Sequence, residues 1–338
     1  MIFFGIEPML TDYRRLCDQR GLSSRYVRAT QGAPWRSWWA LFRALGQLRP
    51  DAIVLHSVKT IVPCWLYASV HRIPLIAVEH QSNELKTVAE RRVSRLVMRL
   101  ADAVVVLTPA YRSALRLIVG RVWRGDKVYV IANGIDTDCF SPAARLGETA
   151  NGPRRIGMAS RFSAIKRHDL LLAAFANLRD SDGDQAWQLS LAGDGETHAE
   201  MQRLAHVLAI EDIVDFPGCL DEQQLFEWFQ RLDIYVQASD GETLSTSMLQ
   251  AMALGLPIVG SPVPGIENLL SEADGTGLLA RDQSAEAFAD AFRQLVEDPD
   301  GAAAVSARAR ALAVSQYSQD TMFKRYRELV QACLKPYT

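Results

Sequence analysis

Short apolar runs of strand length alternate with helix-length segments along most of this chain, and no other feature limits its fold so strongly. The runs are Ala52–Leu55, Leu75–Val78, Ala103–Leu107, Val128–Ile131, Ile156–Ala159, Leu189–Ala192, Ile234–Gln237 and Pro257–Gly260. Strands that are apolar on both faces and separated by helices are typical of parallel sheets covered by helices on both sides. The pattern therefore predicts an α/β chain of doubly wound parallel sheets.

One small, polar stretch interrupts the alternation near the middle of the chain. Residues 141–155 (SPAARLGETANGPRR) contain glycine and proline and lack an apolar run. A chain of 338 residues is expected to form about two domains of roughly 150 residues each. We therefore predict a hinge at 141–155, a first domain over residues 1–145, a second over 153–318, and a C-terminal helix within 319–338.

Charge is distributed unevenly between the two predicted domains. Residues 1–141 hold 20 Lys and Arg against 11 Asp and Glu, a net charge of +9, which leaves 17 against 28, a net of −11, for residues 142–338. A basic half favours an anionic partner, such as an acidic membrane surface or an acceptor that carries phosphate. Nucleic acid would fit the charge too, but the chain has no recognised nucleic-acid-binding motif, so we expect no such partner.

The composition argues against a secreted or membrane-spanning protein. The five cysteines are scattered without a CxxC pair, so neither a disulfide framework nor a zinc knuckle is indicated. The N-terminus lacks the basic segment of a signal peptide, and no apolar run reaches about 18 residues. We expect a cytoplasmic protein, placed at the inner face of the membrane if its basic half binds lipid.

Two segments of the basic half carry aromatic and basic side chains at helical spacing. Residues 33–49 hold Trp35, Trp38, Trp39 and Phe42 with Arg36 and Arg43, and residues 90–102 hold Arg91, Arg92, Arg95 and Arg99. Such helices can lie at a membrane interface, with aromatic side chains in the lipid and basic ones at the headgroups. They can equally pack on a sheet, and then some of the tryptophans belong to the core. The net charge favours peripheral membrane contact.

The segment from Ser239 to Glu267 has the pattern of a binding loop that leads into a buried helix. Ser245, Thr246 and Ser247 are good N-cap residues, and Gly255 followed by Pro257 ends the helix. A helix N-terminus offers free N–H groups to an anion, whereas an acid such as Glu242 beside it suits hydroxyl groups. The segment therefore predicts a pocket for a phosphate and a polyol together, as in a nucleotide sugar.

Glu242, a seven-residue spacer, Gln250 and the run AMALGLPIVGSPVPGI (251–266) resemble the donor-binding segment of glycosyltransferase family 4, retaining enzymes of GT-B fold. Further segments agree in the same order: DAIVLH (51–56), PLIAVEH (74–80), NGIDTDCF (133–140), RFSAIK (161–166), GDG (193–195) and VDFPG (214–218). The resemblance implies two Rossmann-like domains facing a cleft, with the acceptor on the first and the nucleotide sugar on the second. It also implies that the final helix crosses back to the first domain.

The resemblance assigns roles to particular residues. Arg161 and Lys166 would hold the diphosphate that leaves, Glu242 would contact the sugar hydroxyls, and His80 would contact the donor sugar. The nucleotide would also lie against Gly193, Gly195, Pro217, Gly218, Cys219, Thr243, Leu244, Ser245 and Gln250. The alternatives are solvated cations at 161 and 166, a helix-dipole acid at 242, and structural histidines; we expect His56 to be structural. The DxD of Asp136 and Asp138 lies in a segment of the resemblance that leads into the hinge, so no metal cofactor is expected.

Two positions depart from the family pattern. Gln250 stands where the family has a second Glu, and the first strand–helix turn supplies only Gly5 where a Gly-Gly loop is usual. The function that the resemblance implies is metal-independent hexosyl transfer from a nucleotide sugar to a glycan or lipid-linked acceptor, in cell-surface polysaccharide or glycolipid synthesis. A nucleotide-sugar 2-epimerase of the same fold and an inactive binding subunit are the alternatives.

Overall fold

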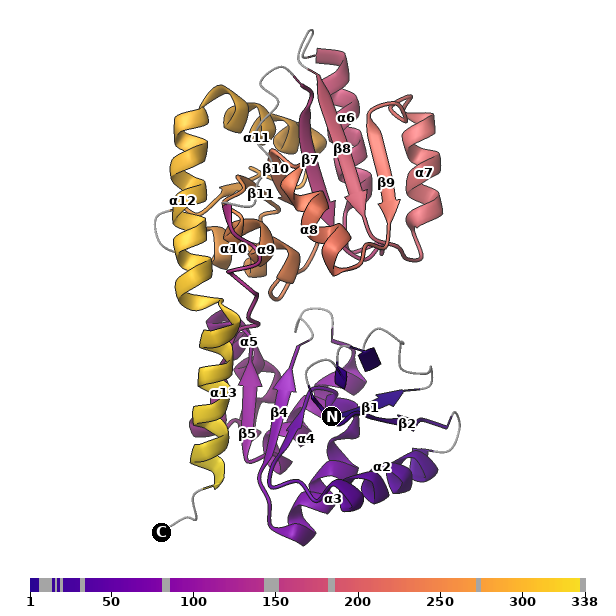
Figure 1. Ribbon diagram of the computed structural model, residues 1–338, viewed down its shortest axis with the longest axis vertical. Helices are drawn as coiled ribbons and strands as arrows, with labels where there is room; N and C mark the ends of the chain where they lie inside the picture. The colour runs from indigo at the N-terminus through magenta and orange to yellow at the C-terminus, as the bar shows by residue number, and fades with distance from the viewer. Residues whose placement is uncertain are drawn as a thin grey trace. The chain divides into compact units, whose positions relative to one another are not determined.

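The computed structural model describes residues 1–5, 14–15, 17–18, 21–30, 34–80, 86–142, 152–181, 186–271 and 275–334. Contacts between Cα atoms divide the chain into two compact units (Figure 1). Unit 1 comprises Met1–Val106, Arg112–Val130 and Tyr326–Thr338, and unit 2 comprises Leu107–Tyr111 and Ile131–Arg325. Residues 143–151 of the predicted hinge lie outside the described residues.

The strands of unit 1 form parallel sheets. One sheet pairs β1 (Ile2–Gly5) with β2 (Arg25–Arg28), and the other has the order β3 (Ile53–Leu55), β4 (Leu75–Glu79), β5 (Ala103–Val106) and β6 (Val128–Val130). The helices along this part of the chain are α2 (Pro34–Leu48), α3 (Ile61–His71), α4 (Val88–Leu100) and α5 (Pro109–Val119), with 3₁₀ turns at Val58–Thr60, Gly120–Val122 and Gly125–Lys127. Every residue of β4 and β5 is buried, as the apolar runs predict.

Unit 2 contains, among the described residues, a parallel sheet of six strands in the order β12-β11-β10-β7-β8-β9. The strands are β7 (Arg154–Ala159), β8 (Trp187–Ala192), β9 (Val214–Gly218), β10 (Ile234–Gln237), β11 (Ile258–Gly260) and β12 (Leu278–Leu279). The helices are α6 (His168–Ser181), α7 (His198–Val207), α8 (Glu222–Gln230), α9 (Thr246–Ala253), α10 (Pro264–Ser271), α11 (Ala285–Glu297), α12 (Pro299–Gln316) and the first part of α13 (Gln319–Leu334).

Helices cover both faces of the unit 2 sheet, because alternate strand residues enter two different cores. Ile234 and Val236 pack in a cluster with α6, α7 and α11, whereas Tyr235 between them packs in a second cluster with α8, α9 and α10. All eight predicted strands are present to within two residues, so the predicted α/β fold of doubly wound parallel sheets is confirmed.

Part of unit 2 comes from a segment that we predicted to belong to the first domain. Ile135 and Phe140 belong to the hydrophobic cluster of unit 2, and Phe140 meets the rings of Phe226 and Phe229 edge-on. Near the C-terminus, the division between the units falls inside α13, after Arg325.

Of the two alternatives for residues 33–49, the one that places some of the tryptophans in the core is wrong. The segment is helical, as predicted, but Trp35, Trp38 and Trp39 are 65%, 37% and 62% exposed. Helix α2 instead buries its smaller residues Leu41, Ala44 and Leu45. No helix in the described parts of the chain is long and apolar enough to span a bilayer.

Candidate functional site

The candidate site lies where the strand order of unit 2 reverses. From β7 the chain proceeds to β8 and β9 on one side, then returns to β10 beside β7 and proceeds to β11 and β12 on the other side. In open parallel sheets, ligands bind beyond the carboxyl ends of the strands at such a reversal. The loops that leave the sheet there are residues 160–167, after β7, and residues 238–245, after β10.

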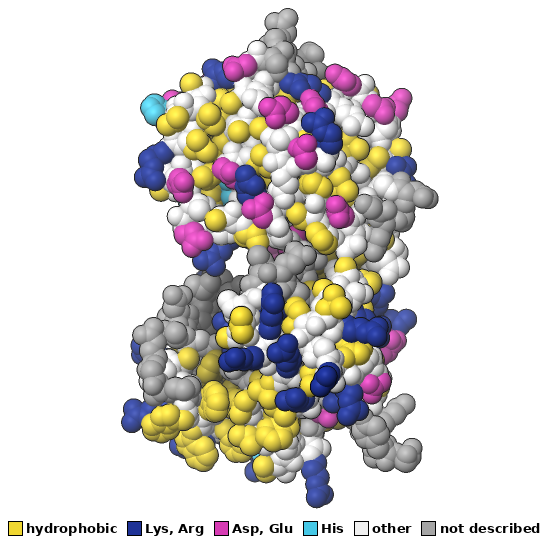
Figure 2. All heavy atoms as spheres, turned by 180° about the vertical axis from the view of Figure 1, so that it is seen from behind, with side chains coloured by type: hydrophobic (Ala, Val, Ile, Leu, Met, Phe, Trp, Pro, Cys, Tyr) yellow, Lys and Arg dark blue, Asp and Glu magenta, His cyan; other side chains and the backbone are white. Residues whose placement is uncertain are grey.

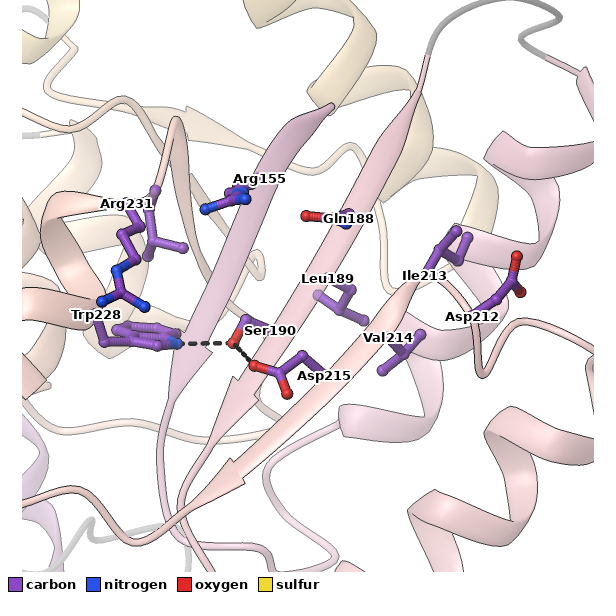
Figure 3. A pocket seen from close by; sticks show the side chains of 11 residues that line it. Arg155, Gln188, Leu189, Ser190, Asp212, Ile213, Val214, Asp215, Trp228 and Arg231 are labelled. Carbon is purple, nitrogen blue, oxygen red and sulfur yellow. Dashed lines mark hydrogen bonds between the residues drawn. The ribbon is translucent and has the colours of Figure 1, made fainter. Parts of the chain in front are cut away.

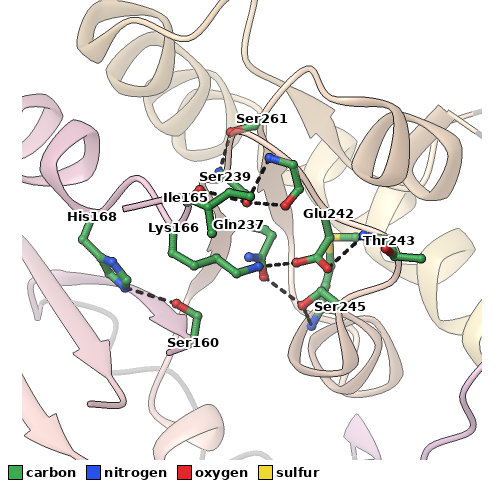
Figure 4. A network of polar contacts seen from close by, with 12 residues as sticks. Ser160, Ile165, Lys166, His168, Gln237, Ser239, Glu242, Thr243, Ser245 and Ser261 are labelled. Carbon is green, nitrogen blue, oxygen red and sulfur yellow. Dashed lines mark hydrogen bonds and ion pairs between the residues drawn. The ribbon is translucent and has the colours of Figure 1, made fainter. Parts of the chain in front are cut away.

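Lys166 and Glu242 join these two loops. The Lys166 ammonium group contacts Glu242 Oε2, and these side chains are only 18% and 14% exposed (Figure 4). Two further bonds fix the loops, since the Ser239 hydroxyl and the Asp240 N–H both donate to the Ile165 carbonyl, at 3.1 and 2.9 Å. The sequence assigned Lys166 to phosphate and Glu242 to sugar hydroxyls, and the structure brings the two side chains into direct contact.

Helix α9 begins at Thr246, and Glu242 lies in the turn before it. Ser245 is its N-cap and accepts a hydrogen bond from the Met248 N–H at 3.3 Å, and Gly255, with φ +69°, follows its C-terminal end. Thr243, Leu244 and Ser245 are buried, and the Thr243 N–H donates to Glu242 Oε1 at 3.0 Å, which fixes the backbone of the loop that precedes α9. The first N–H groups of a helix have no intrahelical acceptor, so this loop presents donors suited to phosphate oxygens.

Buried polar groups behind the loop hold it in place. Gln237 Oε1, which is fully buried in β10, accepts hydrogen bonds from the hydroxyls of Tyr235 and Ser245, both at 2.9 Å. Burial raises the pKa of the Tyr235 phenol above its usual range, so the hydroxyl stays protonated and donates. Sequence reasoning missed Gln237, although a polar residue at the end of an apolar strand was a signal.

Helix α10 also approaches the loop, and Gly265 permits this. A Cβ at Gly265 would lie 1.8 Å from the Glu242 carbonyl oxygen, so a larger residue would displace the backbone that carries Glu242. Gly265 lies within the run that carried the family resemblance, but no separate role was predicted for it.

The GDG turn after β8 packs against the loop that carries Arg161. Gly193 has φ +132°, and a Cβ there would lie 2.0 Å from the Ser160 carbonyl oxygen. Gly195 has φ +154°, and a Cβ there would lie 2.2 Å from the Phe162 carbonyl oxygen. The Phe162 N–H donates to the Asp194 carbonyl at 3.0 Å. The turn therefore needs glycine for its backbone conformation and for its close approach to the loop, and Arg161 itself is exposed.

A neutral histidine supports the same loop. The ring of His168 stacks on Phe162 with centroids 4.0 Å apart, and His168 Nε2 lies 3.1 Å from the Ser160 hydroxyl. Burial lowers the pKa of His168 to about 4, so the ring is uncharged at neutral pH. His168 was not singled out from the sequence, since a lone histidine at a helix start has no distinctive pattern.

The segment Pro217–Cys219, which was predicted to lie against the nucleotide, is at the end of β9 and beside the GDG turn. Pro217 and Gly218 are the last residues of β9, and the Gly218 carbonyl accepts from the Gly193 N–H at 2.8 Å. Cys219 follows and is exposed. Gln250 is half-buried in the second turn of α9, as predicted.

His80 belongs to unit 1, where it follows β4, and His56 follows the neighbouring strand β3. His56 Nδ1 lies 2.9 Å from His80 Nε2, so the rings share one hydrogen bond. Partial burial lowers the pKa of both imidazoles, and charge on the His56 ring lowers the pKa of His80 further. His56 was expected to be structural, and the structure makes it the direct partner of His80.

Two other features lie apart from the candidate site. A pocket of about 270 Å³ is lined near the amino ends of β7, β8 and β9, where Trp228 Nε1 donates to the Ser190 hydroxyl and that hydroxyl to Asp215 (Figure 3). It contains none of the predicted site residues.

The Asp136 carboxylate accepts hydrogen bonds from the N–H groups of Asp138 and Cys139, so it caps a turn. Across the described residues, no group of three or more His, Cys, Asp or Glu could hold a metal ion.

Comparison with known families gives matches to both halves of the chain. A family model described as Glycosyltransferase Family 4 matches residues 8–139, and one described as Glycosyl transferases group 1 matches residues 153–298. A D-inositol 3-phosphate glycosyltransferase of Corynebacterium aurimucosum is 28% identical over 260 residues, 69% of this chain and 60% of the relative. The putative colanic acid biosynthesis glycosyltransferase WcaL of Escherichia coli is 27% identical, over 67% of this chain and 59% of its own. The chain thus spans about 60% of the length of these relatives.

Solved structures resemble the chain over nearly its whole length. Anabaena Alr3699/HepE, crystallised in complex with UDP and glucose, matches with a TM-score of 0.83 at 18% identity, over 98% of this chain and 91% of its own. Sucrose-phosphate synthase from Thermosynechococcus elongatus matches with a TM-score of 0.75 at 21% identity, over 91% and 84%. At 18% and 21% sequence identity, the similarity to these structures shows the fold alone.

Proposed function

Because the chain belongs to glycosyltransferase family 4 and has the GT-B fold, we propose that it transfers a sugar from a nucleotide sugar to a hydroxyl of an acceptor. The observation that carries the proposal is the convergence of Lys166, Glu242 and the start of α9 where the strand order reverses. A cation, a carboxylate and free N–H groups there provide what a diphosphate and a sugar require. The complex of the Anabaena protein with UDP and glucose supports a donor of this class.

The Lys166–Glu242 contact can exchange its partners when the donor binds. When a diphosphate enters, Lys166 can bind its oxygens, and Glu242 then accepts hydrogen bonds from sugar hydroxyls in place of the ammonium group. Arg161, which is exposed beside the GDG turn, supplies a second cation for the phosphates. Both cations act most strongly as the diphosphate gains charge, so they lower the barrier rather than only favouring binding.

We propose transfer with retention and without a metal. The bond between the anomeric carbon and the diphosphate oxygen breaks, the acceptor oxygen attacks the same face, and the departing phosphate takes the acceptor proton. Arg161 and Lys166 supply the positive charge that a metal would otherwise provide. For His80 we propose the role that the family resemblance implies, which is contact with the donor sugar.

For the acceptor, we propose a glycan or a lipid-linked glycan, used in cell-surface polysaccharide or glycolipid synthesis. The net charge of +9 on residues 1–141 supports an anionic acceptor or an anionic membrane beside it.

A donor panel tests the proposal. UDP-, GDP- and ADP-sugars are each incubated with the protein in the presence of a chelator, and we measure the shift in melting temperature and the release of nucleoside diphosphate. We expect one donor to stabilise the protein and to be hydrolysed slowly without acceptor. Release of an epimerised sugar from donor alone would instead identify an epimerase.

Gln250 favours a second candidate, a binding subunit without activity, because an amide replaces the charged acceptor of the family pattern. Donor binding without release of nucleoside diphosphate, unchanged in Gln250→Glu, would support that candidate and contradict transfer.

A further inference from the structure

Helix α2 presents three aromatic side chains that the fold of unit 1 does not cover. Trp35 and Trp39 are more than 60% exposed, and Trp38 lies between them in sequence at 37%. Trp39 stacks on Phe42 with ring centroids 6.1 Å apart, and the Arg36 guanidinium lies 5.2 Å from the centre of the Trp35 ring. Large apolar patches on a protein surface mark sites of interaction, and exposed tryptophans at this density need a partner.

The neighbouring helix extends the apolar surface. Phe42 meets Tyr67 of α3 edge-on at 5.2 Å, so α2 and α3 are packed side by side. Leu66 and Val70, one turn apart on α3, are 44% and 68% exposed. We call these exposed residues of α2 and α3 the apolar patch, namely Trp35, Trp38, Trp39, Leu66 and Val70.

Basic side chains accompany the apolar patch. Helices α2, α3, α4 and α5 together contain eight arginines and one acid, Glu90, whose carboxylate is engaged in the capping box of α4. On α4, Arg91, Arg92, Arg95 and Arg99 are all exposed. Figure 2 shows a field of hydrophobic side chains on unit 1 next to a group of Lys and Arg side chains, with few acidic ones among them.

We propose that this face of unit 1 docks on an anionic lipid bilayer, with the apolar patch in the interface and the arginines of α4 at the headgroups. Tryptophan and arginine are the residues that proteins place at this boundary, because the ring is apolar with one polar edge and the guanidinium binds phosphate. A second copy of this chain is a poorer occupant, since a symmetric interface would bring two basic faces together. The proposal does not depend on the donor site, because docking requires no nucleotide.

Flotation with lipid vesicles tests the proposal. The full chain is mixed with vesicles of phosphatidylcholine and phosphatidylglycerol in equal parts, and with vesicles of phosphatidylcholine alone. We expect binding to the anionic vesicles, weakened by salt, and a shift of tryptophan emission to shorter wavelength. Loss of the shift in Trp35→Ala/Trp39→Ala assigns it to the patch, because Trp65 and Trp123 are also partly exposed, whereas Trp187 and Trp228 are buried.

Paired variants separate the aromatic and basic contributions. Trp35→Ala/Trp39→Ala should reduce the partition coefficient about tenfold or more, from the apolar area withdrawn from the interface. Arg91→Gln/Arg92→Gln should reduce it by a similar factor, about fivefold for each arginine, and most strongly at low salt. The control Arg203→Gln/Lys324→Gln removes the same charge from exposed positions in unit 2 and should leave binding unchanged.

Three results would overturn the proposal: no binding of the wild type to anionic vesicles at low salt, equal binding by the tryptophan and control variants, or a dimer in solution that Trp35→Ala/Trp39→Ala dissociates. The melting temperature of each variant shows that the fold is intact. Failure here would leave the donor-panel result untouched, because that assay contains no lipid.

Discussion

The close approach of the GDG turn to the Arg161 loop predicts a large effect of Gly193→Ala. A Cβ at this position would lie 2.0 Å from the Ser160 carbonyl oxygen. An ordinary carbon–oxygen contact is about 3.3 Å, so the turn and the loop must move apart by about 1 Å. That movement breaks the bonds from Ser160 N–H to Ala192 and from Phe162 N–H to Asp194, both 3.0 Å long.

The cost can be worked out from these contacts. Each lost backbone hydrogen bond costs about 1 kcal/mol, and an alanine at positive φ costs about 1–2 kcal/mol more. Gly193→Ala should therefore destabilise unit 2 by about 3–4 kcal/mol, which lowers the melting temperature by about 6–16 °C for a unit of this size. Donor binding should weaken as well, because the displaced loop carries Arg161.

Gly275→Ala is the matched control. Gly275 has φ +79°, but a Cβ there would meet no atom within 4 Å. It should cost only the conformational strain, about 1–2 kcal/mol. Thermal and urea unfolding measure both variants. An equal loss of stability in the two would refute the steric argument, and an intact donor affinity in Gly193→Ala would refute the link to the Arg161 loop.

Three further changes test the residues around the loops. Lys166→Met should abolish turnover and, because it leaves the Glu242 carboxylate without its cation, should also cost about 1–3 kcal/mol of stability; a variant with full turnover would contradict the role of the pair. Gln250→Glu should strengthen nucleotide binding by about tenfold, through a charge-assisted hydrogen bond, and calorimetry that finds weaker binding would exclude a contact of residue 250 with the nucleotide. Burial lowers the pKa of His168 from 6.5 to about 4, so between these pH values the ring is protonated in the unfolded state and neutral in the folded one. The free energy of unfolding should therefore fall by about 3 kcal/mol as the pH falls from 6.5 to 4. In His168→Gln the urea midpoint should lose this part of its pH dependence, whereas a His206 variant, exposed by 80%, should not.

The sequence predicted the elements of unit 2 well because local rules decide them. The strands around Ile234 and Ile258 are continuous apolar runs, and helix α9 has a serine N-cap and a glycine after its end. These signals lie within a few residues of one another, so no tertiary information was needed.

Contacts between distant segments could not be predicted in the same way. The pairing of Lys166 with Glu242 spans 76 positions and depends on the strand order, which the sequence does not give. Helical spacing also left two alternatives for the tryptophans, and the structure decides between them because α2 buries Leu41 and Leu45 rather than its largest side chains. Helical spacing defines a face, but only the fold decides which face is covered.

Calorimetric titration with UDP, GDP and ADP tests most directly the claim that the strand reversal of unit 2 binds a nucleoside diphosphate. The account predicts that at least one diphosphate binds without metal, that Arg161→Met weakens binding about tenfold or more, and that Arg203→Met, an exposed control in the same unit, does not. Binding that is absent for all three nucleotides, or equal in the two variants, would contradict it.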